Sequence, residues 1–224
     1  MMGSLMVLES RRRRDCIALA LACAALGHLP ARAAGSAPAK ILVVGDSLSA
    51  EYGLKRGTGW VALLTQRLSA QKVPATVINA SISGDTTSGG RSRLPALLKQ
   101  HRPSHVVIEL GGNDALRGLP IQMSEANLRA MTEAAQAAGA KVLIVGIQLP
   151  PNYGKAYGAS FAAIFEKVAE ERRAALVPFF LKGVADIPEP LAMFQDDRIH
   201  PNEKAQVVML DNVWPALKAL LGGR

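Results

Sequence analysis

The chain has 224 residues, of which 49% are hydrophobic, 20% are charged and only 4% are aromatic, and its formal charge at pH 7 is +8. This composition excludes fibrous and intrinsically disordered proteins, and the length suits one domain that buries a core without disulfides or a metal. A basic surface attracts anionic molecules, but no basic run is interleaved with aromatic residues, so nucleic-acid binding is not expected.

The N-terminal segment has the pattern of a secretory signal peptide. Arg11 to Arg14 are basic, an apolar run extends from Cys16 to Leu29, and Ala31-Arg32-Ala33 offers small residues for cleavage. The apolar run is shorter than the roughly 20 residues that span a bilayer, so no stable membrane span is expected. We predict cleavage by signal peptidase after Ala33 and a periplasmic or secreted protein. Lipoprotein anchoring at Cys23 is the alternative, because the residues before it loosely resemble a lipobox.

Signal cleavage would also change the chemistry that the chain can perform. Cys16 and Cys23 are its only cysteines. A chain cleaved after Ala33 would therefore have no disulfide, no thiolate metal site and no cysteine nucleophile. Its formal charge would fall from +8 to +5.

Short apolar runs rich in Val, Ile and Leu recur along the rest of the chain, separated by amphipathic segments. Because the runs are continuous rather than alternating, they are typical of strands buried on both faces of a parallel sheet. The order predicts a single three-layer α/β/α domain with a mostly parallel five-stranded sheet. The expected strands are Ile41–Val44, Thr76–Ile78, His105–Leu110, Lys141–Ile147 and Leu176–Phe180.

Apolar residues spaced three and four apart predict helices between and after these strands. We expect Pro215 to kink or break the last helix, because proline lacks the N–H that the helix needs. The residues expected on buried helix faces are Leu94, Leu97 and Leu98; Leu128, Met131, Ala135 and Ala138; Phe161, Ile164, Phe165 and Val168; and Val207, Leu210, Trp214, Leu217 and Leu221.

Four polar segments are expected in loops at the sheet edge where parallel α/β proteins bind ligands. Each alone is explained as well by a turn or a surface pair. Together, and in this order, they supply every group that acyl transfer requires. The segments are Gly45-Asp46-Ser47-Leu48-Ser49, Asn79-Ala80-Ser81-Ile82-Ser83-Gly84-Asp85, Gly111-Gly112-Asn113-Asp114 and Asp197-Arg198-Ile199-His200-Pro201.

These segments resemble the four sequence blocks of the GDSL/SGNH hydrolases, most closely the bacterial periplasmic branch of thioesterase I, lysophospholipase L1 and arylesterase. The resemblance extends from Lys40 to the C-terminal helix. It implies a flavodoxin-like SGNH hydrolase domain over residues 40–224, after a signal peptide at 1–33 and a short linker at 34–39. It also implies a serine esterase or thioesterase that acts on carboxylic esters, acyl thioesters or lysophospholipids. Glu51 departs from the family, which commonly has a small residue there, and this puts the preference for anionic acyl donors in question.

Ser47 is the expected nucleophile, and a serine hydroxyl needs a neighbouring base to take its proton. His200 is the expected base, both by resemblance and by elimination of the other histidines that would survive cleavage. Those are His101 and His105, and they lack the glutamate of a helical zinc motif, so no metal site is expected there. The three-residue spacing to His200 and the resemblance both favour Asp197 as its partner.

The remaining predicted site residues have supporting roles. The candidate oxyanion donors are the N–H groups of Ser47 and Gly84 and the side-chain amide of Asn113. Asp46 and Asp114 are interpreted as acceptors that hold their loops through backbone N–H groups. No cofactor and no metal are expected.

The loop after the fourth predicted strand lies at the same edge. In the family that the chain resembles, the matching loop lines the acyl pocket. Leu149, Pro150 and Leu116 are therefore candidate acyl contacts, and Tyr153 is a candidate lid. A monomer that acts on a small-molecule ester or thioester is expected.

Other classes of protein fit these segments less well. A non-catalytic phosphate- or nucleotide-binding module would need a glycine-rich phosphate motif after the first strand, and an α/β-hydrolase would need G-x-S-x-G, but the sequence has neither. A catalytically inactive binding protein is disfavoured because Ser47, Asp197 and His200 are all present. A sugar O-acetylesterase would use the same catalytic residues and stays open as the alternative.

Overall fold

A computed structural model describes residues 37–222. The predicted signal peptide, the alternative lipid anchor at Cys23 and the first half of the predicted linker lie outside these residues.

The strands form one five-stranded sheet in the order β2-β1-β3-β4-β5, and every neighbouring pair is parallel. This is the strand order of flavodoxin-like folds. Ile41 to Val44 in the interior strand β1 have no exposed surface, as expected for a strand covered on both faces. The strands are β1 (Ala39–Gly45), β2 (Ala75–Asn79), β3 (His105–Glu109), β4 (Lys141–Val145) and β5 (Ala175–Val177).

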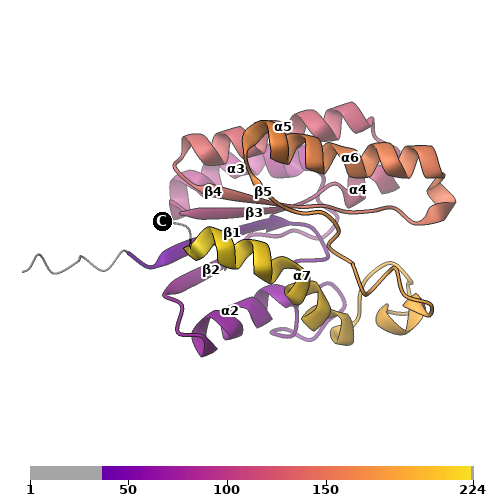
Figure 1. Cartoon of the computed structure of the whole chain (residues 1–224), viewed down its shortest axis with the longest axis horizontal. Coiled ribbons are helices and arrows are strands. Elements are labelled where there is room, and N and C mark those ends of the chain that lie inside the picture. Colours follow the sequence, from indigo (N-terminus) through magenta and orange to yellow (C-terminus); the bar gives the residue numbers. More distant parts are fainter. Residues whose placement is uncertain (1–36, 223–224) are drawn as a thin grey trace, which may run out of the picture. The chain divides into compact units, whose positions relative to one another are not determined.

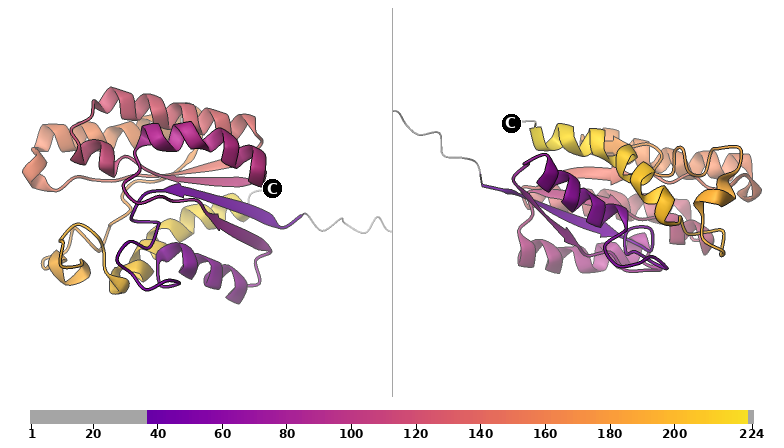
Figure 2. Two further views of the ribbon diagram at one scale, coloured as in Figure 1. Left: turned by 180° about the vertical axis from the view of Figure 1, so that it is seen from behind. Right: turned by 90° about the horizontal axis from the view of Figure 1, so that it is seen from below.

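Helices cover both faces of the sheet and complete the predicted three layers (Figure 1). α3 packs on α5 and α5 on α6 on one face, while α2 packs on α7 on the other, as the two further views also show (Figure 2). The helices are α2 (Trp60–Ala70), α3 (Thr87–His101), α4 (Gly112–Leu116), α5 (Ile121–Ala137), α6 (Lys155–Arg172) and α7 (Glu203–Gly222), with short 3₁₀ turns η1 (Pro151–Tyr153) and η2 (Pro190–Met193).

The predicted ends of three strands were too late in the sequence. β3 ends at Glu109 and β4 at Val145, and β5 ends at Val177, where the following Pro178 has no N–H to continue a ladder. Gly146 and Phe180 are still tied together, since the Phe180 N–H donates to the Gly146 carbonyl over 2.9 Å. The apolar runs extend beyond the strands because the loop residues that follow, such as Ile147 and Phe180, are also buried.

Of the two outcomes expected at Pro215, the break was wrong, because α7 continues through it to Gly222, and the kink stays a prediction. Proline removes one backbone hydrogen bond, whereas buried residues on both sides, such as Val213 and Leu217, pack α7 onto the sheet. The predicted buried faces were also wrong at two positions. Val207 is 50% exposed, and Ala138 is exposed at the end of α5.

Candidate active site

All four predicted segments lie at the carboxyl edge of the sheet. The segment after β2 continues alongside β1 beyond the strand itself, because the Ala80 N–H donates to the Val43 carbonyl and the Ile82 N–H to the Gly45 carbonyl. This pairing brings the Gly84 loop next to the start of the Ser47 loop. The parallel register of β1 and β3, with Gly45 opposite Glu109, brings the Asn113 loop to the other side.

Ser47, His200 and Asp197 form a continuous hydrogen-bonded chain. Ser47 Oγ lies 2.9 Å from His200 Nε2, and His200 Nδ1 lies 2.6 Å from Asp197 Oδ2. The two bonds use the two ring nitrogens, so a neutral imidazole that carries its proton on Nδ1 can accept the serine proton on Nε2. Asp196 is exposed and is not the partner of His200.

A tight hairpin turn carries Asp197 and His200. The second carboxylate oxygen of Asp197 accepts the N–H groups of Ile199 and His200, both over 2.9 Å. Partial burial opposes ionisation of Asp197, but the hydrogen bonds from the His200 N–H, the His200 ring and the Ile199 N–H outweigh it and lower its pKa to about 2. Asp197 is therefore a carboxylate at neutral pH, as an acceptor for Nδ1–H must be.

Asp46 orients the side chain of Asn113, which the sequence interpretation had not anticipated. One Asp46 oxygen accepts the Leu48 N–H, as predicted for a loop-holding residue, but the other accepts the Asn113 amide over 3.0 Å. This bond fixes the Asn113 amide plane and leaves its second N–H for another acceptor. Burial raises the pKa of Asp46 to about 6, although the bonds from Leu48 and Asn113 act in the opposite direction.

A second buried carboxylate lies beneath the nucleophile loop. Glu109 has no exposed surface, and its Oε2 accepts the Ser49 hydroxyl over 2.7 Å. Trp60 Nε1–H donates in turn to Ser49 Oγ. Burial first, and then the charge of Asp46, raise the pKa of Glu109 well above its ordinary value. The sequence pattern placed Glu109 inside a predicted strand and assigned it no role, because its partners come from other segments of the chain.

Gly84 adopts a backbone conformation that favours glycine, with φ of +78°. The guanidinium group of Arg117 donates to the Gly84 carbonyl over 2.7 Å and holds this turn. A side chain could be accommodated sterically, since a Cβ atom would lie 3.6 Å from Arg117. The backbone conformation therefore explains the glycine at this position.

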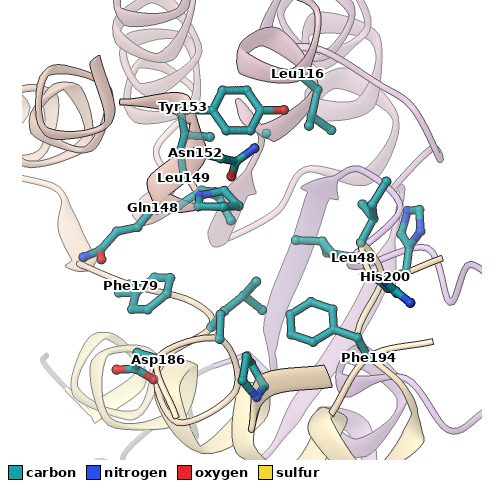
Figure 3. A pocket seen from close by; sticks show the side chains of 18 of the residues that line it. Leu48, Leu116, Gln148, Leu149, Asn152, Tyr153, Phe179, Asp186, Phe194 and His200 are labelled. Carbon is teal, nitrogen blue, oxygen red and sulfur yellow. The ribbon is translucent and has the colours of Figure 1, made fainter. Parts of the chain in front are cut away.

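An open cavity of about 830 Å³ adjoins Ser47 (Figure 3). Ser47, Asn113 and His200 line it, together with all four predicted substrate contacts, Leu116, Leu149, Pro150 and Tyr153. Figure 3 shows Leu149 and Tyr153 on one side of the cavity, with Phe179 and Phe194 across from them.

The sequence prediction missed one wall of this cavity. Phe179 and Leu181 follow β5, and Leu191 and Phe194 precede the catalytic turn. The rule that ligands lie at the carboxyl edge would have indicated the loop after β5. Its apolar residues were instead taken as part of the strand.

Glu51 does not line the cavity. Its carboxylate accepts the N–H groups of Gly57 and Gly59, the latter at the N-terminus of α2, where a negative charge is favourable. These bonds offset the cost of a non-glycine residue at φ of +60°. Glu51, which departs from the small residue common in the family, therefore contacts the start of α2 and not the cavity.

Asp114 and His105 have contacts that stabilise the fold and do not line the cavity. Asp114 is buried and accepts bonds from the Thr87 N–H and the Ser124 hydroxyl, so it ties α4 to α3 and α5. The His105 ring contacts the Ser104 hydroxyl and the Leu220 carbonyl.

Within residues 37–222, no cluster of His, Cys, Asp and Glu side chains suited to a metal ion is found. None of the helices in this range combines the length and the apolar character required to cross a bilayer.

Comparison with known proteins identifies a family of hydrolases. The model of the GDSL-like lipase/acylhydrolase family matches residues 43–208. The chain is 52% identical over 199 residues to the esterase TesA of Pseudomonas aeruginosa, a match that covers 89% of this chain and 96% of that protein. It is 45% identical over 181 residues to thioesterase 1/protease 1/lysophospholipase L1 of Escherichia coli strain K12, covering 81% and 84% of the two chains. It is 47% identical over 174 residues to an arylesterase of Vibrio mimicus, covering 78% and 86%.

Solved structures agree with these matches. A crystal structure of TesA superposes with a TM-score of 0.78 at 53% identity, covering 81% of this chain and 99% of that one. The psychrotrophic esterase EstA from Pseudoalteromonas sp., in a structure inhibited by monoethylphosphonate, superposes with a TM-score of 0.77 at 42% identity, covering 82% and 99%.

Proposed function

We propose a serine-nucleophile mechanism for this chain, which belongs to the GDSL-like lipase/acylhydrolase family. The chain is a hydrolase of carboxylic esters or thioesters, the activities after which its relatives are named. The observation that carries the mechanism is the 2.9 Å separation of Ser47 Oγ and His200 Nε2. In the proposed first step, His200 takes the serine proton while Oγ attacks the acyl carbon.

The attack gives a tetrahedral intermediate, and two further steps complete the proposed reaction. Protonated His200 gives its proton to the departing alcohol or thiol, which leaves the acyl group on Ser47, and a water molecule activated by His200 then hydrolyses this ester. Asp197 stabilises the imidazolium form and keeps Nδ1 protonated. We assign the oxyanion donors to the N–H groups of Ser47 and Gly84 and to the Asn113 amide, and the bond from Asn113 to Asp46 supports this assignment because it orients that amide in advance.

The size and lining of the cavity support acyl chains as the bound group. Leu116, Leu149 and Phe179 present apolar surface within a volume of about 830 Å³, which is far more space than an acetyl group fills. We therefore propose esters, aryl esters, acyl thioesters and lysophospholipids as substrates, in preference to acetylated sugars. No cofactor takes part in the proposed reaction.

We also propose that the chain is processed and exported. The basic cluster, the apolar run and Ala31-Arg32-Ala33 support removal of residues 1–33 by signal peptidase, release of the domain at residues 40–224 and a periplasmic or secreted location. Mass spectrometry of the protein recovered from a bacterial periplasm tests this proposal. A chain that keeps its first 33 residues would contradict it, and a lipid on Cys23 would favour the alternative anchor.

Replacement of the nucleophile tests the mechanism. Ser47→Ala should abolish hydrolysis of p-nitrophenyl butyrate without a change in circular dichroism, and a fluorophosphonate should add its mass to Ser47 in the unaltered protein. Ser49 serves as an internal comparison, since it is buried against Glu109. Full activity of Ser47→Ala, or labelling at Ser49 or Ser81, would refute the assignment.

A further inference from the structure

The turn that carries His200 is a small unit with its own hydrogen bonds. Phe194 and Pro201 form an antiparallel bridge at its base, and the Asp197 carboxylate closes its tip. Asp197 therefore fixes the orientation of the His200 ring within the turn. Because Asp197 belongs to the same turn, it does not fix the distance between that ring and β1.

The side chain of Gln195 joins this turn to the loop that follows Ser47. Its amide nitrogen donates to the Tyr52 carbonyl over 2.9 Å and to the Pro201 carbonyl over 3.2 Å. Its backbone N–H donates to the His200 carbonyl over 2.8 Å. One half-buried residue thus contacts both loops of the catalytic centre. A Cβ atom on the neighbouring Gly53, whose φ is +68°, would lie 2.0 Å from Gln195 Oε1, so a side chain there would displace the Gln195 amide.

The ring of Tyr52 adds a second contact between the same loops. Its centroid lies 4.3 Å from that of the His200 ring, with the two planes tilted by 37°. Tyr52 is 50% exposed, so this large side chain is retained at the surface with one face directed to the imidazole. The backbone of Tyr52 is itself tied to the nucleophile loop, because its N–H donates to the Ser47 carbonyl over 3.4 Å.

Such a link matters most after the first half of the proposed reaction. In the free enzyme, the Ser47 hydroxyl donates to Nε2 and helps to hold the ring. Once Oγ is acylated, it has no proton to donate, and that bond is lost. His200 must still be placed to activate water, and a displacement of about 1 Å can cost on the order of 100-fold in rate.

We infer that Tyr52 and Gln195 are positioning residues that hold the His200 imidazole in line with Ser47, above all in the acyl-enzyme. This inference rests on the proposed function, since it assigns no new chemistry to either residue. Gln195 sets the position of the turn, and Tyr52 covers one face of the ring that the turn carries.

The test uses the full chain with Tyr52→Leu, Tyr52→Phe and Gln195→Leu, assayed on p-nitrophenyl butyrate. Tyr52→Leu and Gln195→Leu should lower kcat by about 10-fold or more, and KM should fall with it because a slower deacylation lowers both, so kcat/KM changes less than kcat. Tyr52→Phe keeps the aromatic face and should stay near the parent. Because deacylation should be slowed more than acylation, Tyr52→Leu and Gln195→Leu should release a larger initial burst of p-nitrophenol than the parent.

Gln136→Ala is the matched control. The Gln136 amide also donates to a backbone carbonyl, that of Arg172 over 2.7 Å, but it joins α5 to α6 far from the site. It should change thermal stability and leave kcat and the burst unaltered. Gly53→Ala is an independent variant that pushes the Gln195 amide aside, and it should reproduce the kinetic effect of Gln195→Leu.

The outcomes separate this inference from the proposed function. If Ser47→Ala is inactive but Tyr52→Leu, Gln195→Leu and Gly53→Ala all keep the parent kcat, the positioning role is overturned and the mechanism stands. A loss in Gln195→Leu that appears only as a lower melting temperature, as in Gln136→Ala, also overturns it. If Ser47→Ala stays active, the mechanism itself fails.

Discussion

Glu109→Gln should change how the stability of the protein depends on pH. Glu109 is fully buried, and burial and then the Asp46 charge raise its pKa well above the ordinary value of 4.5. The folded protein therefore keeps a proton that the unfolded chain releases above about pH 4.5. Unfolding then releases that proton, so stability is fully present at lower pH and falls as pH rises toward the raised pKa, by about 1.4 kcal/mol per pH unit.

Glutamine at this position removes the titrating group while keeping the contacts. Its side-chain oxygen can still accept the Ser49 hydroxyl and the Asp46 N–H, the two bonds that Glu109 Oε2 now accepts. From pH 5 to pH 7, the stability of the parent relative to Glu109→Gln should therefore fall by up to about 2.7 kcal/mol. Asp46 titrates in both proteins, since its own pKa is raised to about 6, and the subtraction removes most of its contribution.

Urea unfolding at pH 5, 6 and 7, followed by far-UV circular dichroism and by tryptophan fluorescence, measures this difference. Comparing slopes against pH, rather than single stabilities, cancels any constant cost of fitting the amide. Parallel curves for the two proteins would show that Glu109 is ionised in the fold across this range, and the reasoning from burial would be refuted.

Two further predictions concern the catalytic turn and the packing of the sheet. Asp197→Asn should reduce kcat by about 10⁴-fold, because the imidazole loses the acceptor that fixes its tautomer, while Asp196→Asn should leave kcat unchanged; equal losses in both would contradict the assignment. Gly146→Ala should destabilise the fold by about 1–3 kcal/mol or more in urea unfolding, since its Cβ would lie 2.6 Å from the Pro178 carbonyl oxygen, a backbone atom that cannot rotate away. Gly158→Ala within α6 is its control, with no atom within 4 Å of the new Cβ, and should stabilise by up to about 1 kcal/mol.

The sequence by itself determined the architecture and the edge of the sheet at which the candidate catalytic groups meet. Continuous apolar runs such as Ile41–Val44 predicted a parallel sheet, because only strands covered on both faces need them. The order of strands and helices then predicted that Ser47, Asn113 and His200 lie at one edge. These predictions succeeded because hydrophobic period and chain order are local properties that the fold preserves.

Only the tertiary structure decided which side chains support those groups. Asp46 and Asn113 are far apart in the sequence, as are Tyr52 and His200, and nothing in their local patterns indicates that they meet. The buried Glu109 is a further example, because its altered pKa comes from burial and from Asp46, which lies in a distant segment of the chain. Local patterning reports which face of an element is buried, whereas the partner that each polar group finds depends on how the loops pack, and that is set by the whole fold.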